Sequence, residues 1–506
     1  MPLPLRALLP HSGSASRASS STDGSASRGR RALHRGSAAA AGLAATGLLA
    51  AGLAPAALAD PAAPLDPVFS ASDQAPGWAS QNGGTDGGAG AGVEATSVVS
   101  DRQELLAALD NGGDRDGEKI IYVDGTIHGN QLPDGTLLGE QDYAPGYDVE
   151  KYLSCFGEQG WSDQTHPYCG EQRRLRTTGS NALKRQIEIS IPSNTTIVGL
   201  GKDSGFDQTT IMFHLAHDVV VRNLSIEAPV DHFSSWDPWD GEQGAWNARF
   251  DAMSSVTSTN IWVDHVTISD GRFLDGDAPI GPNGRPMNRH DGLFDMKDGT
   301  DFVTLSDSYL HSHDKAMLLG SGDDNADTDE GRLRISLIGN RFDGTQQRSP
   351  RVRFGDVHVV NTFFSGRVHD PDSPMTSAAA GGHDYFIGLG YRSQVLSERN
   401  AFEYTGPGAD ATIAVSLHNA HRFQDDGSWF MSQDVDLEAI AADQYEDRVA
   451  EIVASGEELP DWAQSGFEPT VDWEVPYDYT PMTSPSAVKQ HALTGTGAGT
   501  LTVPAP

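Results

Sequence analysis

The 506-residue sequence is poor in cysteine and in positive charge. Its two cysteines, Cys155 and Cys169, are too few for a disulfide scaffold; in an exported protein we expect one bridge between them, and in a cytosolic protein two unpaired thiols. Only 35 Lys and Arg residues stand against 70 Asp and Glu, so the formal net charge is −35. A chain this acidic repels nucleic acids and anionic membranes, and we expect neither as a partner. An anionic substrate would therefore need local positive charge, from a bound divalent cation or from clustered Lys and Arg.

The first 59 residues have the basic, apolar and small-residue order of an export signal. Arginines precede an uncharged Ala/Leu/Gly run that begins at Ser37 and ends in Ala57–Ala59. We expect cleavage after this triplet and a secreted product, and the Arg30–Arg31 pair favours the twin-arginine route. Asp60 and Pro61, directly after the triplet, argue against the alternative, a membrane anchor. Residues 1–59 hold six Arg and one Asp, a net +5, so their removal takes the formal charge from −35 to −40.

Residues 60–95 are rich in Ala, Gly and Asp and are predicted to be a flexible lead-in, followed by a single domain over residues 96–506. Asp101 and Glu104 form a variant of the capping box and predict a short helix. After this helix come short β-rich segments with alternating apolar residues. Few of them are joined by two-residue Asn-Gly or Asp-Gly turns, which favours a parallel β-solenoid over a β-sandwich.

Polar residues recur at the ends of the β-rich segments, and their spacing indicates the length of a coil. The steps between them are 42, 43, 32, 21 and 39 residues. The shortest step is about one coil, and the others are coils with loop insertions or doubled coils. A helical stretch over residues 436–456 and the segment after it are predicted to pack on the solenoid and cap it. The aligned polar residues are Asn223, His265, Ser308, Asn340, Asn361 and Asn400.

The segment NRHDGLFDMKDGTD, residues 288–301, holds two aspartates four residues apart, Asp291 and Asp295. Taken alone, the pair could be a metal site, an acid/base pair or part of a charged surface. In a straight strand their Cα atoms would lie about 13 Å apart, too far to share an ion comfortably. A bend at Gly292 would bring the two carboxylates together.

This segment is one of several linked motifs that resemble the calcium-dependent pectate lyases of polysaccharide lyase family 1. The others include NIWVDHVTISDG, HSHDKAMLLG and RSPRVRFGDVHVVN, and the resemblance runs from about residue 96 to the C-terminus. Their order and separations are highly specific. The resemblance implies an all-β fold, a right-handed single-stranded parallel β-helix, whose surface cleft binds polygalacturonate. Helical covers are expected at its N- and C-terminal ends.

The resemblance makes Asp251, Asp291 and Asp295 the ligands of a Ca²⁺ ion. The choice is chemically sound, because this hard cation binds carboxylate oxygens at about 2.3–2.6 Å. Some relatives add another acidic ligand at the position where this chain has Arg249. The number of ligands is therefore left open.

Cationic residues of two further motifs complete the implied site. By position, Arg348 matches the family's catalytic Arg, and Lys315 and Arg353 match its substrate-binding cations. Lys297 is a further candidate for a substrate contact. In an ideal strand Arg348 and Arg353 would point to opposite faces, but Pro350 between them favours a loop that aims both at one cleft.

The implied reaction is β-elimination in polygalacturonate. The C5 hydrogen lies next to the C6 carboxylate, so its removal builds additional negative charge that calcium and Lys315 would stabilise. Arg348 would take this proton while the O4 glycosidic bond breaks, leaving a 4,5-unsaturated product. Because Arg acts as a base only after giving up its own proton, we expect the best activity at alkaline pH.

Other functions fit the residues less well. A zinc site could use His290, His311 and His313, but no H-x3-H or Cys set accompanies them, and His265 fits a structural role. A polygalacturonase-type hydrolase would need aspartates about 6.5–9.5 Å apart or closer around a water, and its NTD, DD and GHG series does not occur.

Two alternatives are closer to the implied function. Pectin lyase acts on the methyl-esterified polymer and lacks the calcium carboxylates that this chain has. A non-catalytic carbohydrate-binding β-helix would be favoured by loss of Arg348 or Lys315, and both are present. We therefore predict a secreted, monomeric pectate lyase.

Overall fold

The computed structural model describes residues 68–506, except 241–243, 283, 285 and 369–383. The described residues belong to one compact unit, Pro64–Pro506. The predicted export signal, residues 1–59, lies outside the described residues, as do residues 60–67 of the predicted lead-in.

Three long sheets make up most of the described fold, and their strands are parallel except for the last pair of the second sheet. The first sheet contains, in order, β1 (Thr96–Val99), β2 (Lys119–Val123), β7 (Thr195–Gly199), β10 (His217–Arg222), β15 (Thr259–Asp264), β18 (Asp301–Ser306), β21 (Ile335–Ile338), β24 (Asp356–Val360), β27 (Gln394–Glu398) and β30 (Gln424–Asp426). The second contains β3 (Thr126–His128), β8 (Gly205–Asp207), β11 (Ser225–Glu227), β16 (Thr267–Ser269), β19 (Tyr309–Lys315), β22 (Arg341–Gln347), β25 (Phe363–Arg367), β28 (Ala401–Thr405), β31 (Trp429–Phe430) and β32 (Gln433–Asp434). The third contains β6 (Glu188–Ile191), β9 (Thr210–His214), β14 (Met253–Val256), β17 (Phe294–Lys297), β20 (Leu318–Leu319), β23 (Arg351–Val352), β26 (Ile387–Leu389) and β29 (Val415–Leu417).

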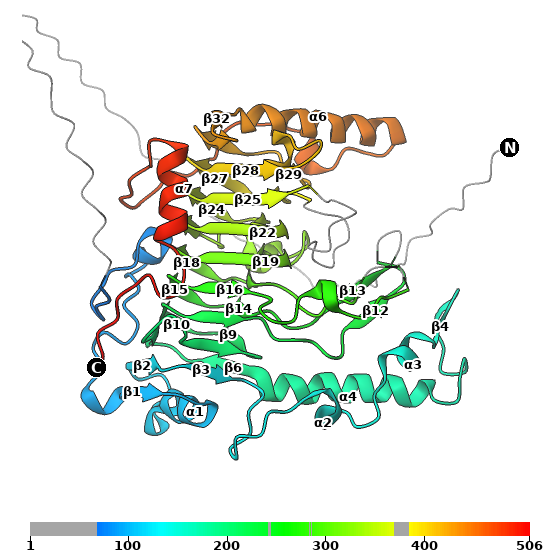
Figure 1. The fold of residues 1–506 in the computed structure, drawn as a ribbon. Coiled ribbons are helices and arrows are strands. Elements are labelled where there is room, and N and C mark those ends of the chain that lie inside the picture. The colour runs from blue at the N-terminus through cyan, green and yellow to red at the C-terminus, as the bar shows by residue number, and fades with distance from the viewer. Residues whose placement is uncertain (1–67, 241–243, 283, 285, 369–383) are drawn as a thin grey trace, which may run out of the picture. The chain divides into compact units, whose positions relative to one another are not determined.

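Successive strands along the chain enter different sheets, so each coil supplies one strand to each sheet. Strands β9, β10 and β11 form one coil and pair with β14, β15 and β16 of the next. In Figure 1 the strands stack coil upon coil from β1 to β32. This architecture is the right-handed parallel β-helix that the sequence predicts.

Columns of apolar side chains fill the interior. In the first sheet Val221 lies beside Val263 of the next coil, and both are 0% exposed. In the second sheet the rings of Phe342, Phe364 and Phe402 stack, with centroids 5.3 and 4.7 Å apart. Full burial of such a side chain contributes roughly 1.5–3 kcal/mol, so these columns hold the coils in register.

The polar residues at the ends of the first-sheet strands occupy two neighbouring turn positions, not the single position that the sequence alignment predicts. Three lie directly after their strands: Asn223, His265 and Asn361. Three lie one residue later: Ser308, Asn340 and Asn400. Asn340 links its turn to the neighbouring coil, because it accepts from the Ser308 N–H at 3.0 Å and donates to the Leu305 carbonyl at 2.9 Å.

Helix α1 (Arg102–Asp110) covers the first coil. Asp101 caps it by accepting from the Glu104 N–H at 2.9 Å, and the Glu104 carboxylate accepts from the Ser100 N–H at 2.8 Å. The predicted variant of the capping box is therefore present. Leu105 and Leu109 point into the interior of the β-helix and are 0% and 1% exposed.

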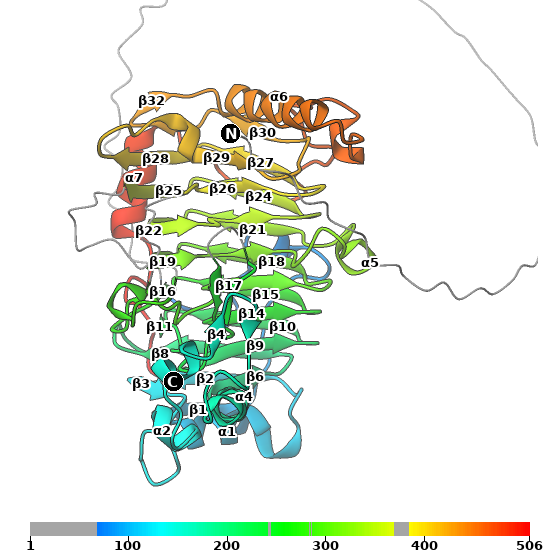
Figure 2. The same ribbon diagram turned by 90° about the vertical axis from the view of Figure 1, so that its right-hand side faces the viewer.

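Helix α6 (Leu437–Ser455) lies over the last coils (Figure 1, Figure 2). Its Leu437 belongs to the same hydrophobic core as the strands. The segment after α6 returns along the β-helix, where the Tyr477 hydroxyl lies 2.7 Å from Ser336 Oγ and helix α7 (Pro485–Thr494) buries Val488 against the second sheet. The predicted helical covers are confirmed at both ends.

Residues 68–95, predicted as part of the flexible lead-in, pack along the outer face of the first sheet. The Trp78 N–H donates to Ser336 Oγ at 2.9 Å, and the Ala79 N–H donates to Thr304 Oγ1 at 3.0 Å. Trp78 is 7% exposed and Ala79 is 0% exposed. The prediction of flexibility does not hold here, because hydroxyl groups on successive strands bind the backbone of this segment.

Helix α4 (Cys169–Ile187) was not predicted, because its buried stripe includes Gln172 and Gly179 and so breaks the apolar pattern. The Cys155–Cys169 disulfide joins its first residue to the region that holds α3 (Val149–Leu153) and the hairpin of β4 (Phe156–Gly157) and β5 (Gly160–Trp161), which confirms the expected bridge. None of the described helices has the length and apolar content needed to cross a membrane. The other described helices and the second hairpin are α2 (Glu140–Tyr143), α5 (Ala326–Asp329), and β12 (Ser235–Asp237) with β13 (Ala245–Asn247).

Candidate active site

The third sheet brings together the residues singled out by the sequence. Asp251 lies just before β14, Asp291 lies before β17, and Asp295 and Lys297 lie within β17. Because side chains alternate along a strand, the buried Phe294 and Met296 send Asp295 and Lys297 to the outer face. Below, Asp251, Asp291 and Asp295 are called the cleft carboxylates.

Gly292 leaves space for the carboxylates of Asp251 and Asp295, and it does not bend a strand as the sequence predicts. Strand β17 begins at Phe294, so Asp291 lies in the preceding loop and the two aspartates do not share one straight strand. A Cβ atom on Gly292 would lie 2.3 Å from Asp295 Oδ1 and 3.1 Å from Asp251 Oδ1. Only glycine leaves room for both carboxylates over this backbone position.

Two of the cleft carboxylates are arranged in the same way. Asp251 Oδ1 accepts from the Gly292 N–H at 3.0 Å, and Asp295 Oδ1 accepts from the Leu318 N–H at 2.9 Å. Their Oδ2 atoms both face Lys297 Nζ, at 3.3 Å from Asp251 and 3.4 Å from Asp295. The backbone therefore fixes one oxygen of each carboxylate and aims the other at a shared point.

The electrostatics of these groups reflect crowding of like charge. Burial, and then the charge of Asp251, raises the pKa of Asp295 to about 7, although Lys297 opposes this. Asp251 and Asp295 are 6% and 4% exposed. Burial itself lowers the pKa of Lys297, but the charges of Asp251 and Asp295 outweigh it and the net shift is upward. Lys297 is therefore a cation held in place by the cleft carboxylates.

Asp291 faces the cationic side of the site. Burial raises its pKa, as does the charge of Asp251, while Lys315, Lys297 and Arg348 act in the opposite direction. Its backbone carbonyl accepts from His313 Nε2 at 2.7 Å, which fixes the loop. Among the described residues, the three cleft carboxylates are not one of the groups whose ligand atoms all lie within 4.8 Å of one another. Asp291 thus lies close to the pair that binds Lys297 without converging on the same point.

The predicted loop is present only at residues 348–350, and strand β23 (Arg351–Val352) separates it from Arg353. Strand β22 ends at Gln347, Arg348 has a φ of +61°, and a cis bond joins Ser349 to Pro350 before the short strand β23. Both arginines therefore lie outside strands. Arg353 is held by Asp323, with Nε 2.7 Å from Asp323 Oδ1, and by the Gly320 carbonyl.

Lys315 and Arg348 are the least constrained cations of the site. Lys315 is the last residue of β19, and no described residue makes a hydrogen bond or ion pair with its Nζ. The buried Nε of Arg348 likewise has no hydrogen-bond partner among the described residues. These two side chains are thus available for an anionic ligand. Arg249 donates away from the cleft carboxylates, to Ser180 and Asn181 of α4.

Sequence reasoning missed two residues of the cationic side, Arg351 and His418. The register of β17, β20 and β23 puts Arg351 on the same outward column as Asp295, two strands along. Burial, and then the charges of Arg351 and Arg353, lowers the pKa of His418 to about 4, which leaves the imidazole neutral. The only sequence feature that could have indicated Arg351 is its place as the middle arginine of RSPRVRFG. No sequence feature indicated His418.

The histidines considered for zinc make other contacts. His313 is buried between Asp270 Oδ1, at 2.5 Å from Nδ1, and the Asp291 carbonyl. Burial lowers the pKa of His313, but Asp270 outweighs this and raises it to about 9. Both ring nitrogens of His290 lie within 3.0 Å of backbone carbonyls, and His311 stacks on Tyr309 at 4.4 Å. The three histidines together are not among the groups of described residues whose ligand atoms lie within 4.8 Å of one another, whereas His290 forms such a group with Asp270 and Asp275.

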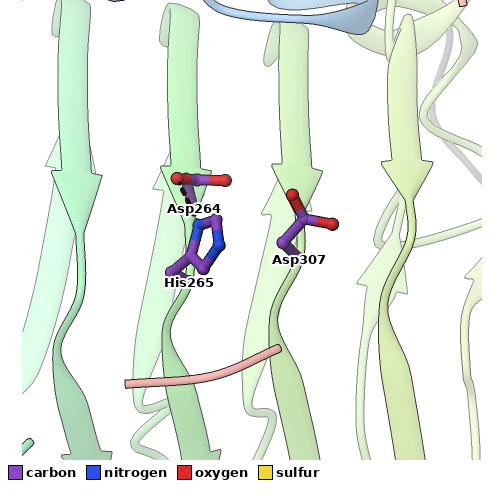
Figure 3. Close-up of side chains that lie close together, drawn as sticks. All are labelled: Asp264, His265 and Asp307. Atoms are coloured by element: carbon purple, nitrogen blue, oxygen red, sulfur yellow. Dashed lines mark hydrogen bonds and ion pairs between the residues drawn. The ribbon is translucent and has the colours of Figure 1, made fainter. Parts of the chain in front are cut away.

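A second acidic group, the turn cluster, lies where β15 and β18 end (Figure 3). It consists of Asp264, His265 and Asp307, which Figure 3 labels, together with Arg222 and Ser306, which bond Asp264. Asp264 Oδ2 accepts from Arg222 Nε at 2.8 Å and lies 2.6 Å from His265 Nδ1, and Oδ1 accepts from Ser306 Oγ at 2.6 Å. Burial by itself raises the pKa of Asp264, but His265 and Arg222 together hold it below its usual value.

The C-terminal segment closes the turn cluster. Asp307 Oδ1 lies 2.7 Å from His491 Nε2, and its carbonyl accepts from the Gly497 N–H at 2.9 Å. Arg222 also lies over the Trp262 ring, 4.3 Å from its centroid. Every group of the cluster is occupied by protein, which agrees with the structural role predicted for His265.

Known proteins resemble the chain along most of its length. The family model described as pectate lyase matches residues 177–501. Pectate lyase of Bacillus subtilis (strain 168) is 34% identical over 340 residues, covering 67% of this chain and 78% of the relative. Pectate lyase D of Dickeya chrysanthemi is 33% identical over 431 residues, covering 84% and 89%. The solved structure of a pectate lyase bound to a hexasaccharide is 30% identical with a TM-score of 0.72, covering 84% of this chain and 97% of that one.

Proposed function

Because the chain belongs to the pectate lyases of polysaccharide lyase family 1, we propose that it cleaves α-1,4-linked polygalacturonate by calcium-assisted β-elimination. The observation that carries this proposal is the pairing of two buried, preoriented carboxylates with two unpaired cations beside them. One oxygen of Asp251 and one of Asp295 face the same point. Burial raises the pKa of the neighbouring Asp291, whereas the charges of Lys315 and Arg348 act to lower it and so lie on the same side of the site. Such a site suits a substrate that carries a carboxylate at the reacting carbon.

The cleft carboxylates fit a calcium ion by their chemistry. All the donors are oxygens, and the backbone holds Asp251 and Asp295 in fixed orientations through Gly292 and Leu318. The space over Gly292 admits both carboxylates only because no Cβ is present. Asp251, Asp291 and Asp295 would hold the ion, and a bound Ca²⁺ would supply positive charge to the C6 carboxylate of the substrate.

The other site residues bind the substrate and move its proton. Lys315 would pair with the C6 carboxylate, and Arg353, fixed by Asp323, would orient the neighbouring sugar unit. Arg348 would take the C5 proton as the C4–O4 bond breaks, so that the electron pair of the C5–H bond becomes the 4,5 double bond. The departing O4 takes up a proton, and no water is added across the broken bond. Lys297 is a further candidate for a substrate contact.

We propose secretion from the basic, apolar and small-residue order of the N-terminal segment. Residues 1–59 would direct export and be removed, and residues 96–506 would form the catalytic β-helix of a secreted monomer. The packing of residues 68–95 along the first sheet adds this segment to the mature fold.

Ultraviolet absorbance of a 4,5-unsaturated uronide tests the proposal directly. The purified protein is incubated with polygalacturonate in calcium, then in chelator, and then with methyl-esterified pectin. We expect absorbance to rise only with polygalacturonate and calcium. Equal rates with chelator would refute the role of calcium, and preference for the esterified polymer would make the protein a pectin lyase. An Arg348→Lys variant with full activity would refute the assignment of the base alone.

A further inference from the structure

Lys297 occupies the point at which the two best-oriented carboxylate oxygens converge. Its Nζ lies 3.3 Å from Asp251 Oδ2 and 3.4 Å from Asp295 Oδ2. Its side chain is 24% exposed, whereas those of the two aspartates are 7% and 6% exposed. The ammonium therefore covers the carboxylates from the solvent side of the sheet.

The pairing explains how two buried like charges are tolerated. Each carboxylate has one backbone N–H on Oδ1, and no described side chain other than Lys297 makes an ion pair with either of them. Leaving a buried carboxylate without a counter-ion is costly. Lys297 is thus the only charge compensation from described side chains.

A divalent cation held by Asp251 and Asp295 would compete for the same two oxygens. A Ca²⁺ ion needs carboxylate oxygens at about 2.3–2.6 Å, and the oxygens with no backbone donor are the two Oδ2 atoms. An ammonium that contacts both of them leaves no room for the ion between them. One of the two cations must therefore leave this point when the other occupies it.

From this geometry we infer that Lys297 is a built-in counter-ion that competes with calcium. In the absence of the metal its ammonium contacts one oxygen of Asp251 and one of Asp295 and so holds the two carboxylates together. With calcium bound, the Lys297 ammonium would leave the two oxygens, and its side chain would remain at the cleft as an additional cation for the anionic polymer. This inference rests on the proposed calcium site and adds a residue that weakens binding of the ion.

Calcium titration calorimetry of Lys297→Met tests the competition, with the wild type and Lys315→Met measured alongside. Lys315 is the matched control. It also lies at a strand end and its charge influences the pKa of Asp291, but it makes no ion pair with Asp251 or Asp295. We expect Lys297→Met to lower the calcium dissociation constant at least about 10-fold, since the number of charges at a site sets its affinity. We expect Lys315→Met to change it less than about 3-fold, as an unpaired charge nearby.

A second readout requires no metal. In chelator, Lys297→Met should unfold at a lower urea concentration than wild type, whereas Lys315→Met should match wild type. Lys297→Gln, of similar length and without charge, is measured as well, in case the Met variant does not fold.

The outcomes separate the two proposals. If wild type fails to bind calcium, the proposed calcium site is wrong, and the counter-ion falls with it. If wild type binds calcium, and Lys297→Met and Lys315→Met both bind it more tightly by the same factor, the gain comes from removing any nearby positive charge. The competition is then refuted. The competition is also refuted if Lys297→Met and Lys297→Gln bind calcium as wild type does or more weakly.

Discussion

The cleft carboxylates and the turn cluster each contain a deeply buried aspartate, but the pKa values of the two aspartates are shifted in opposite directions. Asp264 is 2% exposed and Asp295 is 4% exposed. The pKa of Asp264 is held down because Arg222, His265 and Ser306 outweigh the effect of burial. The pKa of Asp295 rises to about 7, because burial and Asp251 outweigh Lys297.

The difference shows that burial by itself does not indicate what a buried carboxylate is for. The carboxylate of Asp264 is saturated with donors from the protein, so it stabilises the fold and has little capacity for a ligand. The carboxylate of Asp295 has one backbone donor and a displaceable lysine, and it stands next to like charge. It is therefore suited to binding a cation. The same chemical group thus serves structure in one place and has the surroundings expected of a cation ligand in the other.

The largest effect is expected from Asp264→Asn. This change leaves the buried Arg222 with only the partly exposed Asp73 as a counter-ion. Removing one partner of a buried ion pair costs about 3–5 kcal/mol, and we expect about 3 kcal/mol because Asp73 remains. Urea unfolding in chelator measures this loss, and calorimetry should give an unchanged calcium affinity. A variant as stable as wild type would refute the structural role of the turn cluster.

The matching change in the other group, Asp295→Asn, should reverse this result. The amide oxygen can still accept from the Leu318 N–H, so we expect the free energy of unfolding to stay within about 1 kcal/mol of wild type. Loss of a charged ligand should weaken calcium binding at least about 30-fold, or about 2 kcal/mol. If calorimetry finds wild-type affinity, Asp295 is not a ligand and the comparison between the two groups fails.

The fold could be predicted because its signals are local and repeated. Alternating apolar residues, recurrent turn residues and the absence of tight hairpin turns indicate a solenoid. Coil alignment was less certain, since loops of different length separate the strands, and three of the six aligned polar residues were one position off. Helix α4 was missed because the face that it buries includes Gln172 and Gly179.

Motifs indicate the candidate members of the site but not the contacts between them. The candidates are Asp251, Asp291, Asp295, Lys315, Arg348 and Arg353. Contacts between coils, such as the pairing of Lys297 with Asp251, depend on which strands stack, and sequence spacing does not report this. For the same reason Gly292 was expected to bend a strand, when its neighbours Asp251 and Asp295 require the absence of a Cβ.

A smaller effect is expected from Gly292→Ala. The new Cβ would lie 2.3 Å from Asp295 Oδ1 and must displace that carboxylate. Overpacking of this kind costs about 1–3 kcal/mol, and we expect roughly a 10-fold loss of calcium affinity. Gly201→Ala is the control, because nothing lies within 4 Å of a Cβ there. Equal affinities of the two variants in calorimetry would show that the space over Gly292 does not shape the site.

The smallest effect concerns how the turn cluster responds to pH, through His265. Burial lowers the pKa of this imidazole, but the hydrogen bond and charge of Asp264, together with the charge of Asp307, outweigh burial and Arg222, so the net shift is upward. A histidine whose pKa is higher in the folded state stabilises the fold fully below its unfolded pKa of about 6.5. That contribution is lost as pH rises through the folded value.

His265→Gln should therefore cost more stability at pH 6 than at pH 9, by about 1 kcal/mol, the scale of one hydrogen bond. Urea unfolding in chelator at both values measures the difference from wild type. His491→Gln is the control, because this partly buried imidazole lies outside the turn cluster and bonds Asp307 but not Asp264. If the cost of His265→Gln is equal at the two values, or if His491→Gln shows the same dependence, the charge on His265 does not hold Asp264 in place. Arg222 and Ser306 would then be the donors that hold Asp264 in place. The turn cluster would differ from the cleft carboxylates only in that its cation, Arg222, is fixed, whereas Lys297 can be displaced.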